Sequence, residues 1–162
     1  MKTRFRLILL LTIPLVGCAG WRQALQPPAL DKQREERRAD AVRSFEEQRD
    51  TAQLQAALDR WALGDVDGCE TRLRGLLTRR TDNHMARLHL AELLWSRGDA
   101  AAAEQELREV ITAEPKSAEA HHLLGLLLAE QDRLDDAREH LASAAELEPA
   151  NELFRETRDA YQ

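Results

Sequence analysis

The sequence repeats itself at an interval of thirty-four residues, and this interval constrains the fold more than any other feature. Leucines recur at positions 90 and 124, 94 and 128, and 107 and 141, while Ala103 matches Ala137 and Pro115 matches Pro149. A composition bias would not align different residue types at one interval. Because a fixed period of this size is typical of solenoid arrays, we expect stacked copies of one small unit.

Each unit has the pattern of two helices joined by a short turn. Gly98-Asp99 and Asp132-Arg133 are suited to the turns, Ser117 and Asn151 are suitable N-caps, and a proline follows each second helix. Aromatic residues make up only 4% of the 162-residue chain, and Ala, Leu, Glu, Arg and Gln dominate it. These residues favour helices and disfavour sheets, so the sequence predicts an all-α fold.

The two units resemble the tetratricopeptide repeat, a helix pair with apolar, small and proline residues at fixed offsets. The later unit matches at Leu124-Gly125, Leu128, Ala137, Leu141, Ala144 and Pro149, and the earlier one at Leu90-Ala91, Leu94, Ala103, Leu107, Val110 and Pro115. A degenerate unit precedes them, with Ala57, Gly64-Asp65, Cys69, Leu73 and Leu76 in register but Thr81 in place of proline. The resemblance implies a short solenoid, closed by a C-terminal capping helix.

The N-terminal residues have the layout of a secretory signal peptide. Lys2, Arg4 and Arg6 precede an apolar run that ends at Val16. An uncleaved membrane anchor is the alternative, but spanning a bilayer takes roughly 20 apolar residues, and polar Arg22 follows too soon. Leu15-Val16-Gly17-Cys18 then resembles the lipobox of bacterial lipoproteins.

The lipobox resemblance implies that cleavage leaves Cys18 as the first residue, carrying diacylglycerol and an amide-linked acyl chain such as palmitate. Several acyl chains give persistent membrane attachment. Ala19 stands where an aspartate would resemble an inner-membrane retention signal. The expected location is therefore the cell envelope, on the periplasmic face of the outer membrane. No disulfide is expected, because Cys69 is then a single thiol, which we expect to be a small buried helix residue rather than a reactive group.

The chain is thereby divided into a signal peptide, a lipidated tether, a polar N-terminal helix, three repeats and a cap. The boundaries are 1–17, 18–29, 30–49, 50–83 (degenerate), 84–117, 118–151 and 152–162. The breaker-free stretch from Leu30 to Leu63 forms one long helix or two closely spaced ones, which would cover the N-terminal end of the array. Small residues are expected where paired helices cross, at Ala57/Cys69, Ala91/Ala103 and Gly125/Ala137.

In the family, the first helix of each unit lines a concave groove. Helical spacing places a set of residues on that face: Leu58, Trp61, Leu88, Glu92, Trp95, His122 and Leu126. Trp61 and Trp95 are thirty-four residues apart and therefore occupy equivalent positions. They could form an apolar strip for a partner helix or extended peptide, or both indoles could belong to the core.

The charge of the chain is unevenly distributed. The net charge is −6, but residues 84–162 hold 17 acidic and 8 basic side chains, whereas residues 18–83 are balanced. Such a surface argues against nucleic-acid binding and favours a basic partner segment. The alternative is that this acidic surface only keeps the protein soluble.

No arrangement typical of an enzyme is present. There is no Gly-rich phosphate loop, no H-E-x-x-H and no paired C-x-x-C. Glu119 with His122, and His89 with Glu92, have the i,i+3 spacing of metal ligands, but polar residues are expected in a groove. We therefore expect no catalytic residue, metal or cofactor, and interpret the chain as an interaction or assembly adaptor. The alternatives are a spacer that self-associates through its N-terminal helix, and an accessory subunit of a pilus, secretion or outer-membrane assembly complex.

Overall fold

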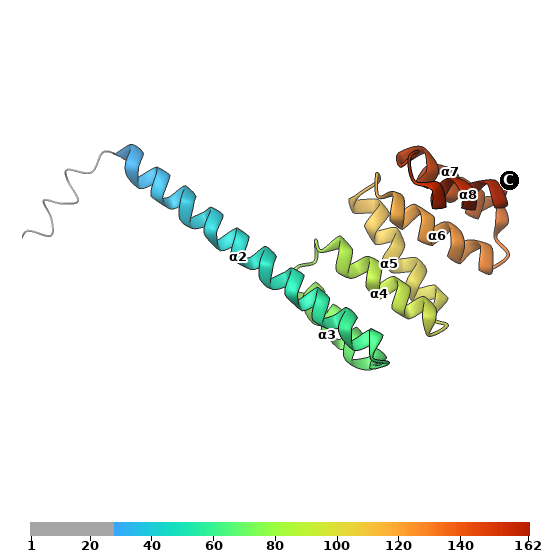
Figure 1. Ribbon diagram of the computed structural model, residues 1–162, viewed down its shortest axis with the longest axis horizontal. Helices are drawn as coiled ribbons and strands as arrows, with labels where there is room; N and C mark the ends of the chain where they lie inside the picture. Colours follow the sequence, from blue (N-terminus) through green and yellow to red (C-terminus); the bar gives the residue numbers. More distant parts are fainter. Residues whose placement is uncertain (1–27) are drawn as a thin grey trace, which may run out of the picture. The chain divides into compact units, whose positions relative to one another are not determined.

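The computed structural model describes residues 28–162, with side chains from Leu30 onward. The expected signal peptide, the lipobox with Cys18 and nearly all of the tether lie outside these residues. The described residues form seven helices and no strand, which confirms the all-α prediction (Figure 1). No described helix combines the length and the apolar character needed to cross a bilayer. The helices are α2 (Pro28–Ala62), α3 (Val66–Arg79), α4 (His84–Ser96), α5 (Ala100–Ala113), α6 (Ala118–Glu130), α7 (Leu134–Leu147) and α8 (Glu152–Ala160).

Helix α2 is a single uninterrupted helix that contributes to two compact units. The first unit ends at Glu46, and the second comprises residues 47–162. In the first unit the side chains from Leu30 to Phe45 are all exposed, including those of Val42 and Phe45. The first buried side chain along α2 is that of Asp50, so the N-terminal cover of the array comes from the later part of this helix.

In the second unit the helices pair as hairpins with equivalent turns. Gly64, Gly98 and Asp132 are thirty-four residues apart and have positive φ values of 82°, 83° and 61°. Glycine adopts this left-handed conformation without a steric penalty, and aspartate does so at a higher cost. The repeat therefore sets the turn even where glycine is missing.

Polar side chains cap most of the helices that begin after these turns and loops. Asp65 accepts a hydrogen bond from the backbone N–H of Gly68 at 2.9 Å, and Asp99 accepts one from Ala102 at 3.1 Å. Ser117 caps α6 as predicted. Asn151 occupies the N-cap position of α8, but its side chain makes no capping hydrogen bond.

The hairpins are held together by small residues at the helix crossings and leucines around them. The three expected crossing pairs, Ala57/Cys69, Ala91/Ala103 and Gly125/Ala137, are all buried. A Cβ atom on Gly125 would lie 2.7 Å from Leu141 Cγ and 3.2 Å from the backbone oxygen of Ala137, so glycine at this position permits the close approach of α6 and α7. Burial raises the pKa of the Cys69 thiol, and Cys69 is a buried core residue as predicted.

The helices at the two ends of the array have polar residues at positions where the internal helices have buried leucines. Leu93 and Leu127 are fully buried, whereas the equivalent residue of α2 is exposed Asp59. At the other end, Arg158 of α8 replaces the buried leucines at positions 90 and 124. Terminal units of solenoids require such polar outer faces.

Candidate functional site

The residues predicted to line a groove lie on α4, α6 and the C-terminal part of α2, the first helices of the three hairpins. Their exposure divides them into two groups. Leu88 and His122 are buried. The half-buried members are Leu58, Trp61, Glu92, Trp95 and Leu126.

The two tryptophans are part of the core packing and are also partly exposed. Trp61 and Trp95 both pack against the main hydrophobic core while each keeps part of its ring accessible. The indole N–H of Trp95 donates a hydrogen bond to the carboxylate of Glu130 on α6. Trp95 thus also links two neighbouring first helices and is held in place at the surface.

His122 is enclosed by the C-terminal helix. Its ring lies 4.6 Å from the ring of Phe154, and its Nε2 atom is 3.2 Å from the Thr157 hydroxyl. Because that hydroxyl donates its proton to the Leu153 carbonyl, it accepts a hydrogen bond from Nε2–H of His122. Burial lowers the pKa of His122. A partner in the groove would reach this side chain only if α8 moved away.

The candidate metal ligands are not brought together as a cluster. Glu92 is paired with His89 within α4, at 2.8 Å from the ring nitrogen Nδ1, while His122 contacts α8. Among the residues the structure describes, no group of three or more His, Cys, Asp or Glu side chains could hold a metal ion.

Two adjoining hollows lie at the N-terminal ends of the first helices in the second unit. One is formed by residues of α2 and α4, including Leu54 and Met85, and the other by residues of α4 and α6, including Leu88 and Glu119. The hollows share Arg80, Asn83 and Met85, and we call the pair the N-terminal trough. Met85 is 49% exposed there, which offers an apolar contact at its centre.

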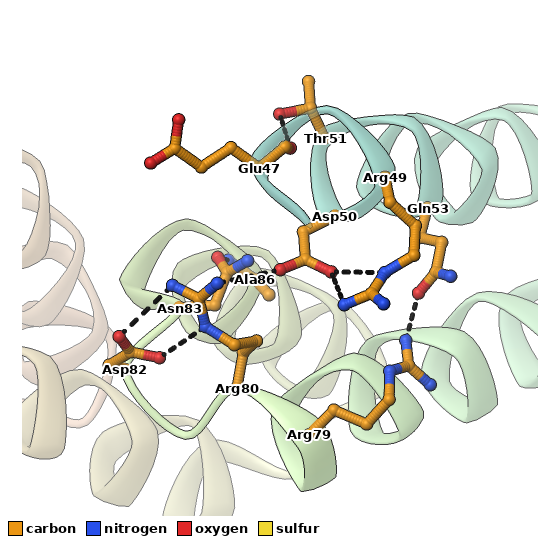
Figure 2. A network of polar contacts seen from close by, with 10 residues as sticks. All are labelled: Glu47, Arg49, Asp50, Thr51, Gln53, Arg79, Arg80, Asp82, Asn83 and Ala86. Carbon is orange, nitrogen blue, oxygen red and sulfur yellow. Dashed lines mark hydrogen bonds and ion pairs between the residues drawn. The ribbon is translucent and has the colours of Figure 1, made fainter. Parts of the chain in front are cut away.

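A polar network fixes one wall of this trough. Figure 2 shows the Asp50 side chain pointing from α2 toward Arg80 in the α3–α4 loop. The carboxylate of Asp50 accepts from Arg49 at 3.1 Å and from Arg80 at 3.3 Å. Arg80 also pairs with Asp82 at 3.0 Å, and the hydrogen bond that it donates lowers the pKa of Asp82.

Two further contacts complete the network. Asn83 accepts from the backbone N–H of Ala86 at 3.0 Å and so caps α4. Arg79 donates to the side chain of Gln53 on α2. Arg79 thus joins the end of α3 to α2, as Arg80 joins the loop before α4 to α2 (Figure 2).

Sequence reasoning identified Leu88 of the trough but missed Met85, Arg80 and Asp50. Met85 lies three residues before Leu88 and therefore on the same face of α4, next to the first residue of the helix. Asp50 and Arg80 are thirty residues apart, and no local pattern predicts that they meet. The signal that could have found Met85 was its offset of thirty-four residues from Glu119 and from Thr51, which also line the trough.

The comparisons with known proteins agree on the fold. The tetratricopeptide repeat model matches residues 60–127 and 94–156, which together make up more than half of the chain. No curated protein matches the sequence.

Several solved structures are similar to the described helices. One is the first tetratricopeptide repeat domain of Spaghetti (RPAP3), bound to the HSP90 peptide SRMEEVD. It has 15% identity and a TM-score of 0.64, over 70% of this chain and 90% of that one. The Yersinia enterocolitica type III secretion chaperone SycD, in complex with a peptide of the translocator YopD, has 15% identity and a TM-score of 0.61, over 68% and 85%. The Thermobaculum terrenum O-GlcNAc transferase has 26% identity and a TM-score of 0.62, but only 22% of that chain is covered.

Proposed function

Since the chain belongs to the tetratricopeptide repeat family, we propose that it is a protein-interaction adaptor that holds a partner peptide or helix in the groove lined by α2, α4 and α6. The observation that carries the proposal is the run of accessible apolar side chains on these helices, above all Met85, Trp61 and Trp95. Aromatic anchors of this kind dominate binding energy at interfaces. RPAP3 and SycD, which have a similar fold, are each described in complex with a peptide, and this supports a peptide as the partner.

We propose further that the adaptor is a lipoprotein of the bacterial cell envelope, attached through lipid on Cys18 to the periplasmic face of the outer membrane. The support is the order of basic residues, apolar run and Leu15-Val16-Gly17-Cys18. Attachment of this kind would hold the groove near the membrane, where it could assemble partners. A role in a pilus, secretion or outer-membrane assembly complex is one form of this proposal.

Lipidation is tested by growing cells with alkyne-palmitate and separating membranes from soluble proteins. We expect the wild-type protein to be labelled and to sediment with the outer membrane. The Cys18→Ser variant should lose the label and the membrane association, while Cys69→Ser, the matched control, should keep both. Equal labelling of all three proteins would overturn the lipoprotein proposal.

Groove binding is tested by affinity capture of the full chain from its own envelope. The double variant Trp95→Ala with Leu126→Ser should lose partners that the wild type retains. The control is Leu134→Ser with Leu147→Ser, which removes two partly exposed leucines of α7. Melting curves of both double variants confirm that they fold. Recovery of identical partners with all three proteins would contradict the proposal.

A second candidate function is a spacer that self-associates through the N-terminal part of α2. The observation that favours it is the exposure of the large apolar side chains in this part of α2, those of Leu30, Val42 and Phe45, at 45%, 56% and 66%. If the chain is such a spacer, sedimentation should show a dimer. The double variant Val42→Ser with Phe45→Ser should dissociate this dimer, and the groove variants should leave it intact.

A further inference from the structure

The charges around the N-terminal trough do not balance. Asp50 and Asp82 are matched by Arg49 and Arg80. Three carboxylates that line the trough remain beyond this network, those of Glu47, Glu114 and Glu119. The trough therefore has an excess of negative charge.

These three carboxylates are open to a ligand. In the part of the chain that the structure describes, Glu47 and Glu119 form no ion pair, and both side chains are exposed. Glu114 is 3.4 Å from the Nε2 atom of His84, which carries a charge only when it is protonated, and the Glu114 side chain is 53% exposed. A cation entering the trough would thus meet carboxylates whose charge is not already neutralised by arginine.

The apolar surface lies between the carboxylates. Met85 lines both hollows, Leu54 lines the hollow with Glu47, and Leu88 lines the hollow with Glu114 and Glu119. A long aliphatic side chain with a cationic end matches this arrangement, because its methylene groups can cover apolar surface while its charge stays near the carboxylates and the solvent. Lysine and arginine are the side chains with that chemistry.

We propose that the N-terminal trough selects a partner segment that carries lysine or arginine close to an apolar residue, and that it rejects an acidic segment. The inference rests on the proposed function, because it assigns the chemistry of the partner for the same groove. Met85 supplies the central apolar contact, and Glu47, Glu114 and Glu119 receive the cationic groups. Like charges placed opposite one another would disfavour an acidic partner.

The experiment measures binding of fluorescein-labelled peptides to the full chain by anisotropy. The probe contains lysine, leucine and serine. One comparison peptide replaces each lysine with glutamate, and another replaces each leucine with serine. We expect the lysine–leucine peptide to bind most tightly, with an affinity that falls as salt is added, since exposed charges are screened.

Two variants and a control locate the site. Glu119→Lys should weaken binding of the lysine–leucine peptide about fivefold, the size expected when one exposed attraction becomes a repulsion. Met85→Ser should weaken it while leaving the salt dependence unchanged. Glu146→Lys, a reversal of an exposed carboxylate on α7 outside the trough, should have no effect.

Each contrary result has a distinct meaning. Binding of the glutamate peptide as tight as that of the lysine peptide, or equal losses from Glu119→Lys and Glu146→Lys, overturns the charge selection and leaves groove binding in place. A dimer of the chain alone that Glu119→Lys dissociates makes a second copy the occupant, which also overturns the inference. If no peptide binds and groove substitutions leave the captured partners unchanged, the proposed function fails together with it.

Discussion

Replacement of Gly125 by alanine tests the packing on which the array depends. An added Cβ atom would lie 2.7 and 2.8 Å from Leu141 Cγ and Cδ2, and 3.2 Å from the Ala137 carbonyl oxygen on the facing helix. Both groups belong to α7, and the carbonyl cannot move without the helix. Overpacking of this kind costs about 1–3 kcal/mol, while the higher helix propensity of alanine returns about 1 kcal/mol. The net expectation is a loss of up to about 2 kcal/mol.

Gly75→Ala is the matched control, because Gly75 lies within α3 and a Cβ atom there would meet nothing within 4 Å. Only the helix propensity changes, so this variant should gain up to about 1 kcal/mol. Urea denaturation followed by circular dichroism gives both free energies of unfolding, and the account predicts that they differ by about 1–3 kcal/mol. Equal stabilisation by the two alanines would refute the close approach of α6 and α7.

Three further predictions concern the same fold. Ala137→Phe should destabilise the chain by about 1–3 kcal/mol through overpacking of the same crossing, and an unchanged melting temperature would reject the repeat register. Asp132→Gly should raise the free energy of unfolding by about 0.5–1 kcal/mol, because position 132 has a φ of 61°; a lower melting temperature would count against it. The pKa of His140 is lowered by burial and then by the charge of His121. Its unfolded form therefore binds more protons, and stability should be complete above the ordinary histidine pKa of about 6.5 and fall as the pH drops below it. His140→Asn should weaken this acid dependence in urea titrations, and an unaltered pH profile would contradict the assignment.

The ring of His140 is in contact with the ring of His121, and the two centroids are 5.2 Å apart. His121 Nε2 is 3.3 Å from the Pro115 carbonyl oxygen, so Nε2–H donates to it. The Nδ1 atoms of the two rings are 3.0 Å apart, and His121 Nδ1 then accepts from His140 Nδ1–H.

Much of the fold follows from the thirty-four-residue interval. The turns at Gly64, Gly98 and Asp132, the buried crossing pairs and the Ser117 cap are local or periodic features, and each lies where the interval predicts. Local propensity also predicts the helices, because no segment combines alternating polarity with β-branched residues.

The site was less accessible from the sequence because its details depend on contacts between distant residues. Periodicity assigns His122 to the groove face, but it contains no information on where α8 packs, and Phe154 and Thr157 enclose this ring. The pairing of Asp50 with Arg80 likewise arises from the folding of α3 back along α2. The spacing placed Trp61 and Trp95 on equivalent positions, but their packing against the core depends on contacts that the spacing does not contain.

The central claim is that a partner occupies the groove, and photo-crosslinking in living cells tests it most directly. Benzoylphenylalanine is incorporated at Met85 in the trough, at Glu146 on α7 and at Phe45 in the N-terminal part of α2. If a partner occupies the groove, Met85 gives an adduct with another protein and Glu146 gives none. Adducts only from Phe45, joining two copies of this chain, would contradict it and establish the spacer instead.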